Sequence, residues 1–75
     1  MHIKKIQGIR ESVIENEIML FNTYTYEWIK LTGSAFELWN RMQKNIVVSL
    51  DSNECERLKN VISFLVRNNY IEAQP

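Results

Sequence analysis

Apolar and polar residues follow different patterns in the two halves of this chain, and the change falls near residue 31. Before it, apolar residues stand in short runs rich in β-branched and aromatic side chains, a pattern typical of strands. After it, they recur every three or four positions, which places them on one face of a helix. The sequence therefore predicts an α+β domain, a three-stranded antiparallel sheet packed on two to three helices.

Three segments of the first half are candidate strands. Residues 3–10 carry isoleucines among polar residues, and we expect a weak strand or an arm there. Residues 12–14 and 18–22 flank Glu15-Asn16-Glu17, and this polar break predicts a hairpin. Residues 23–31 alternate aromatic with polar side chains, which makes them the clearest strand. Alternation places three aromatic side chains on one face of it: Tyr24, Tyr26 and Trp28.

The second half contains two clear helices. Ala35, Leu38, Trp39 and Met42 have helical spacing, and Thr32 can cap this helix, with Ser34 and Glu37 as an alternative capping box. A second helix is expected after the capping residues 51–54, where carboxylates favour a helix start. Its apolar stripe comprises Cys55, Leu58, Val61, Ile62 and Leu65.

The segments beside the second helix are less regular. Residues 44–50 are short and β-branched, and predict either an extended connection or one small strand. Asn68-Asn69 can end the last helix because asparagine tolerates the left-handed conformation. We expect the tail at Tyr70-Ile71 to fold back on the core.

Composition narrows the class of protein. The chain has 75 residues with nine basic and nine acidic side chains, so residues 1–75 are expected to form a single domain of zero net charge. Duplex binding normally needs a basic excess, which makes a nucleic-acid partner unlikely on this balance. One cysteine and one histidine exclude an internal disulfide and a Cys/His zinc site. Without a membrane-spanning run or a signal-peptide core, we expect no membrane partner and a cytoplasmic location.

Residues suited to catalysis are few. We expect His2 at a frayed terminus and Cys55 as a small core residue. Asp51, Glu54 and Glu56 are explained by helix capping and solvation. The sequence has no Gly-rich phosphate loop and no GxSxG or HExxH motif. It therefore predicts a non-catalytic protein with no cofactor and no metal site.

An open sheet edge offers another function. A three-stranded sheet has at least two edge strands, and their unpaired N–H and C=O groups can bind an extended peptide by β-strand addition. Because this mechanism needs neither a charge excess nor a catalytic residue, it fits the composition.

Two stretches of the chain have a familiar pattern: residues 18–22 followed after a turn by 28–39, and residues 61–71. Together they resemble the PqqD-like family. The likeness spans roughly residues 9 to 71, with Asn69 where the family usually has glycine. It implies a winged-helix-like fold with three strands packed on three helices. Residues 44–50 depart from the family, which normally has a second helix there, often after an Asp-Gly turn.

The resemblance also implies a function. Members of this family bind the leader segment of a ribosomally made precursor peptide and deliver it to modifying enzymes such as radical-SAM proteins, peptidases or cyclases. The leader lies as an added strand against the third strand, in a cleft whose other wall is the last helix.

Carried over by position, the strand side of that cleft comprises Tyr26, Glu27, Trp28, Ile29 and Lys30. The helix side comprises Arg57, Leu58, Val61, Ile62 and Leu65. Leu58, Ile62 and Leu65 are equally good core residues. Lys30, Arg57 and Lys59 are either partners for acidic leader residues or solvated charges.

Two other classes of protein stay open. A small winged-helix nucleic-acid-binding protein would use residues 51–68 as its recognition helix, but Asp51, Glu54 and Glu56 would meet phosphates with like charge. A dimerising interaction protein would use an exposed sheet edge for self-association.

Overall fold

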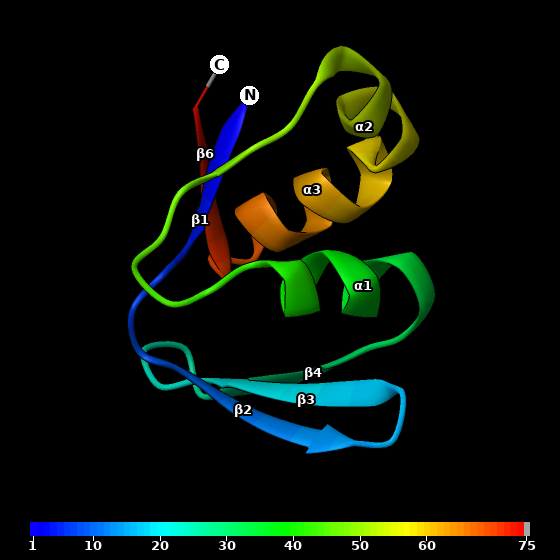
Figure 1. The fold of residues 1–75 in the computed structure, drawn as a ribbon. Coiled ribbons are helices and arrows are strands. Elements are labelled where there is room, and N and C mark those ends of the chain that lie inside the picture. The colour runs from blue at the N-terminus through cyan, green and yellow to red at the C-terminus, as the bar shows by residue number, and fades with distance from the viewer. Residues whose placement is uncertain (75) are drawn as a thin grey trace.

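The computed structural model describes residues 1–74 and contains two antiparallel sheets and three helices (Figure 1). The α+β class predicted from the sequence is therefore correct, whereas the prediction of a single sheet is wrong. The elements, in chain order, are β1 (His2–Lys5), β2 (Ile9–Ile14), β3 (Glu17–Asn22), β4 (Glu27–Leu31), α1 (Gly33–Arg41), β5 (Val48–Ser49), α2 (Ser52–Arg57), α3 (Lys59–Arg67) and β6 (Ile71–Gln74).

The first sheet, here called the hairpin sheet, consists of β2, β3 and β4 in that order. Its β2–β3 turn is Glu15-Asn16, which lies within the predicted break of residues 15–17, although Glu17 already belongs to β3. Glu15 takes a positive φ of 55° in this turn. Burial alternates along β3, so Ile18, Leu20 and Asn22 face the core while Glu17, Met19 and Phe21 face away. Figure 1 shows α1 on the core side of this sheet.

The strand predicted over residues 23–31 is half wrong, because residues 23–26 form the turn between β3 and β4. The buried Asn22 stabilises that turn: its Oδ1 accepts from the N–H groups of Tyr24 (2.9 Å) and Thr25 (3.2 Å). The Tyr26 N–H donates to the Asn22 carbonyl at 2.8 Å, and Tyr26 has a φ of 62°. An asparagine side chain that replaces backbone partners in this way favours a turn over an extended strand.

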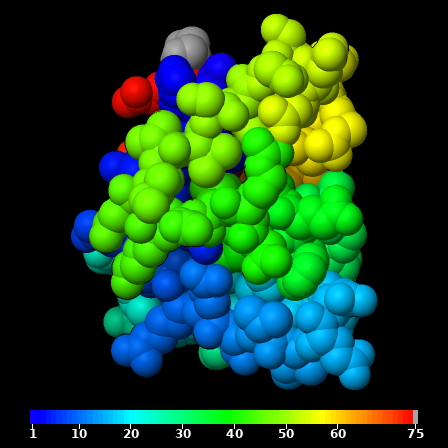
Figure 2. All heavy atoms as spheres, in the orientation of Figure 1, coloured from blue at the N-terminus to red at the C-terminus, as the bar shows by residue number. Residues whose placement is uncertain are grey.

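The second sheet, here called the terminal sheet, consists of β5, β1 and β6 in that order. It joins the two ends of the chain: His2 is paired with Ser49 on one side and Gln74 on the other. His2 therefore lies in a strand, with Nδ1 2.8 Å from the Ser49 hydroxyl, and the prediction of a frayed terminus is wrong. Residues 44–50 do contain one small strand, β5, and Figure 2 shows this segment lying across β1.

Helix α1 begins after Thr32, as predicted, but the Thr32 side chain makes no capping hydrogen bond. The predicted last helix is divided in two at Leu58, whose backbone leaves the helical conformation (φ −102°, ψ 12°). Asp51 and Glu54 form a capping box at the start of α2. Asn69 takes the left-handed conformation (φ 64°), and Tyr70 and Ile71 fold back into the core, both as expected.

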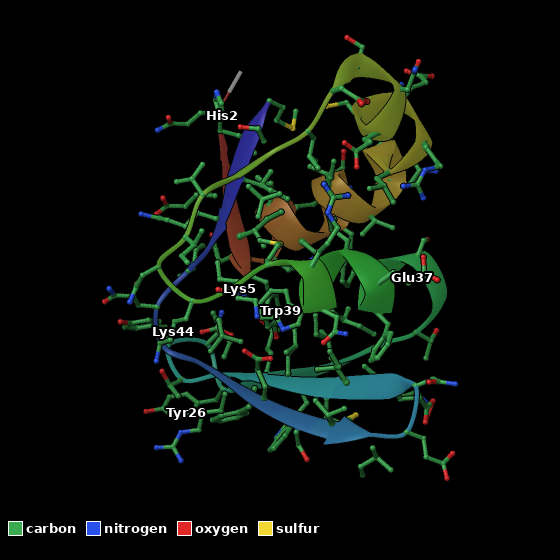
Figure 3. All side chains as sticks on the ribbon, viewed as in Figure 1. His2, Lys5, Tyr26, Glu37, Trp39 and Lys44 are labelled. Carbon is green, nitrogen blue, oxygen red and sulfur yellow. The ribbon has the colours of Figure 1, made fainter. Side chains whose placement is uncertain are left out.

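The core unites both sheets and the helices, and Trp39 of α1 lies fully buried within it. The Trp39 indole Nε1 donates to Glu11 Oε1 of β2 at 3.0 Å. Lys5 of β1 lies 4.5 Å from the Trp39 ring centroid and 3.2 Å from Glu11 Oε2. This polar cluster links β1, β2 and α1, and the side chains of Lys5 and Trp39 lie between the two sheets in Figure 3.

Candidate functional site

The outer strands of the hairpin sheet, β2 and β4, each pair with β3 alone. The Thr23 N–H donates to the Gly8 carbonyl at 3.0 Å, and this bond shows which residue pairs of the β2–β3 ladder are hydrogen-bonded. Since bonded and non-bonded pairs alternate in an antiparallel ladder, odd-numbered β3 residues bond to β2 and even-numbered ones to β4. The bonded partners on β4 are then Glu27, Ile29 and Leu31. Trp28 and Lys30 consequently direct their backbone N–H and C=O groups outward, away from β3.

An open groove of about 290 Å³ lies where the end of β4 and the start of α1 meet α3. Leu31 of β4, which is only 2% exposed, and Ala35 of α1 line it on one side, and Val61 and Phe64 of α3 line it on the other. Phe64 is 43% exposed, which is unusual for a phenylalanine beside a packed core. The groove is completed by Lys30, Thr32 and Asn60.

The strand-side residues predicted from the family resemblance occupy different surroundings. Lys30 lines the groove, and its Nζ lies 3.3 Å from Glu17 Oε2 on the sheet. Glu27 is exposed at the start of β4, and its carbonyl accepts a hydrogen bond from the Tyr70 hydroxyl at 3.3 Å. Ile29 is partly buried against the core. Tyr26 belongs to the preceding turn, not to the strand.

Packing buries most of the residues that were predicted for the helix side of the cleft. Leu58, Ile62 and Leu65 are 2%, 5% and 0% exposed in the core, and none of the three lines the groove. Arg57 lies at the end of α2, where it borders a different hollow together with Glu37 and Arg41. Of the five predicted helix residues, only Val61 lies in the groove.

Phe64 was missed by the sequence analysis, although its spacing carries a signal. Asn60, Val61 and Phe64 stand at i, i+1 and i+4, next to the stripe of Leu58, Ile62 and Leu65. The apolar surface of α3 is therefore wider than the stripe that packs against the core. Val61 and Phe64 lie outside that stripe and face the groove.

Of the residues that line the groove, only Lys30 is charged, and Glu17 pairs with it. Helix α3 contains Lys59 and Arg67, both exposed, and no acidic residue.

At the other end of β4, burial and the nearby Glu27 carboxylate raise the pKa of the Tyr70 hydroxyl. That hydroxyl donates to the Glu27 carbonyl at 3.3 Å.

The face of the hairpin sheet turned away from α1 carries an aromatic cluster, defined as Phe21, Tyr26 and Trp28. The Phe21 ring centroid lies 4.7 Å from that of Trp28 and 6.3 Å from that of Tyr26. Trp28 is 61% exposed and Tyr26 77%, in contrast to the buried Trp39. Figure 3 shows Tyr26 on the side of the sheet opposite the helices.

Other chemistry is sparse over residues 1–74. Within that range, no three His, Cys, Asp or Glu side chains are grouped so as to hold a metal ion. None of the helices described is both long and apolar enough to cross a membrane. Two further hollows border the terminal sheet, and their linings are largely charged and polar, with Lys4 and Glu72 in both.

Comparisons of this chain with models of known protein families, with curated proteins and with solved structures found no match.

Proposed function

We propose that this protein is a non-catalytic binding module that captures the leader segment of a ribosomally made precursor peptide by β-strand addition and presents it to a modifying enzyme. The single observation that carries the proposal is the free edge of β4 beside the groove of Leu31, Ala35, Val61 and Phe64. An added strand would bond to the outward groups of Trp28 and Lys30. The resemblance to the PqqD-like family, and the winged-helix-like arrangement that it implies, belong to this proposal.

The neighbourhood of this edge indicates the chemistry of the peptide. Side chains of an added strand alternate between the two faces of the sheet, so every second one would face the groove. Val61 and Phe64 favour aliphatic or aromatic side chains at those positions. Lys59 and Arg67 favour acidic residues in the flanking segments. The proposed ligand is therefore an extended, partly apolar and net acidic peptide.

Lys30 allows a sharp test because its backbone and its side chain can be changed separately. Lys30→Pro deletes an outward N–H, whereas Lys30→Ala keeps that N–H and removes the same exposed side chain. Proline is tolerated at an edge position whose N–H makes no ladder bond, so both variants should fold. We expect Lys30→Ala to bind within about twofold of the parent, because an exposed ion pair contributes little. Lys30→Pro should bind about tenfold more weakly, which corresponds to the loss of one hydrogen bond of about 1.4 kcal/mol.

The proposal predicts a short reading frame for a precursor peptide beside the gene for this chain. The probe is a labelled synthetic peptide covering the leader half of that precursor, and the measurement is fluorescence anisotropy. Thermal unfolding establishes that each variant is folded. Equal affinities for Lys30→Pro and Lys30→Ala would rule out strand addition at β4.

A further inference from the structure

The outward face of the hairpin sheet has an order of side chains that suits contact with a second copy of itself. Arg10, Phe21 and Trp28 lie directly opposite one another on β2, β3 and β4 and form one row across the sheet. The aromatic contact between Phe21 and Trp28 places both on this face, and the pairing of Arg10 with Phe21 places Arg10 beside them. The row thus has the Arg10 guanidinium at one end, the Phe21 phenyl ring at the centre and the Trp28 indole at the other end.

We infer that this face is the interface of a symmetric homodimer in which Arg10 of each copy stacks on Trp28 of the other. A twofold axis in the plane of contact and parallel to β3 exchanges β2 and β4 between copies. It therefore brings Phe21 against its counterpart and Arg10 over the indole of Trp28 on both sides. A guanidinium over an indole face is a favourable cation–π arrangement. The inference is independent of the peptide edge, because it uses the face of the sheet and not the free groups of β4.

The composition of the row supports a contact surface. Tryptophan, tyrosine and arginine are the residues that most often dominate interface energies. Here Trp28 and Tyr26 are mostly exposed on a face that no described helix or strand covers. The next row across the sheet consists of Ser12, Met19 and Lys30. The same axis brings Met19 near the Met19 of the second copy and Ser12 over the Lys30 of the second copy. Glu17 lies near the axis too, where its own Lys30 at 3.3 Å offsets its charge.

The area of this face of the hairpin sheet determines how strongly two copies are expected to associate. Three strands of about five residues span roughly 14 by 17 Å, far less area than the roughly 800 Å² that each partner buries in a stable complex. The dimer should therefore be weak, with half-association at about 0.1 to 1 mM.

Sedimentation velocity over this concentration range tests the inference. We expect the parent to shift toward the dimer as concentration rises, and Arg10→Glu and Trp28→Ala each to abolish that shift. Arg67→Glu is the matched control, because it makes the same charge change at the end of α3, an element outside the hairpin sheet, and should associate as the parent does. A parent that stays monomeric at about 1 mM would overturn the inference, as would association that Arg10→Glu and Trp28→Ala leave unchanged.

A mixed-label experiment locates the contact. A nitroxide on Ser12→Cys, in a Cys55→Ser background, is mixed with isotope-labelled parent protein. We expect broadening of the Lys30 and Trp28 amide signals of the isotope-labelled copy, which carries no nitroxide, since the proposed axis places Ser12 of the other copy over Lys30. Broadening confined to β2 would mean association through the β2 edge, and broadening at Val61 and Phe64 would mean association through the groove; either pattern contradicts the inference.

Discussion

Asn22 shows how one residue determines where a strand ends. It is 1% exposed, and its Nδ2 donates to the Asn69 carbonyl at 3.2 Å while its Oδ1 accepts from the turn of residues 23–26. It thus connects the β3–β4 turn to the end of α3. The alternation of aromatic residues at 24, 26 and 28 predicted a continuous strand, because sequence periodicity does not show that a buried amide will bond to the following backbone.

Asn22→Ala should destabilise the protein by about 2 kcal/mol, because it removes three hydrogen bonds that the buried Asn22 side chain makes with the backbone. Asn40→Ala, at an exposed position of α1, is the control and should change the free energy of unfolding by less than about 0.5 kcal/mol. Urea unfolding measures both. A similar small change in both variants would mean that the Asn22 bonds do not stabilise the turn.

At the scale of single elements, the sequence predicts local structure well where local residues determine it. The β2–β3 hairpin, the start of α1 and the capping residues of α2 were all found from short patterns. The break at Leu58 was missed because neither glycine nor proline marks it. At this break the Leu58 N–H still donates to the Glu54 carbonyl and the Leu58 carbonyl still accepts from Ile62, each at 2.9 Å. The hydrogen-bonding pattern therefore continues while the backbone direction changes.

The α2 cap makes stability depend on pH. The Glu54 carboxylate accepts a hydrogen bond from Arg41 and one from the Asp51 N–H, and these contacts lower the pKa of Glu54 below its usual 4.5. Because the folded pKa is the lower one, the stabilisation is complete above pH 4.5 and is lost as pH falls through the folded value.

Glu54→Gln removes the titrating group but keeps an acceptor for the capping box. We expect its melting temperature to lie below that of the parent at neutral pH and the difference to shrink in acid. Glu56→Gln, which removes a carboxylate from the same helix outside the capping box, should lower the neutral-pH melting temperature less. A Glu54→Gln deficit that stays constant from neutral to acid pH would contradict this account.

At the scale of the whole molecule, the elements that the sequence did not predict are those formed by distant segments. The terminal sheet pairs residues 2–3 with 48–49 and residues 2–5 with 71–74. Each strand is too short for a clear local pattern, so only the completed fold determines their pairing. The same holds for the groove: its two walls were predicted as β4 and the last helix, but packing decides that Val61 and Phe64 are available and that Leu58, Ile62 and Leu65 are buried.

The pairing of the two chain ends in the terminal sheet also helps to fix the walls of the groove relative to each other. Trp39, Lys5 and Glu11 connect α1 to both sheets, while α3 contacts β6 of the terminal sheet. The two walls of the groove, β4 and α3, are therefore fixed through a common core. A peptide that adds to β4 would meet a preformed surface, which lowers the ordering cost of binding.

Amide hydrogen exchange, read by NMR residue by residue with and without the leader peptide, tests the central claim most directly. In the free protein we predict fast exchange at Trp28 and Lys30, whose N–H groups face outward, and slow exchange at Ile29 and Leu31, which bond to β3. Saturation with the peptide should slow exchange at Trp28 and Lys30 and leave the β2 edge unchanged. Protection of Trp28 and Lys30 in the free, dilute protein, or continued fast exchange at both when peptide is bound, would contradict a leader-binding edge at β4.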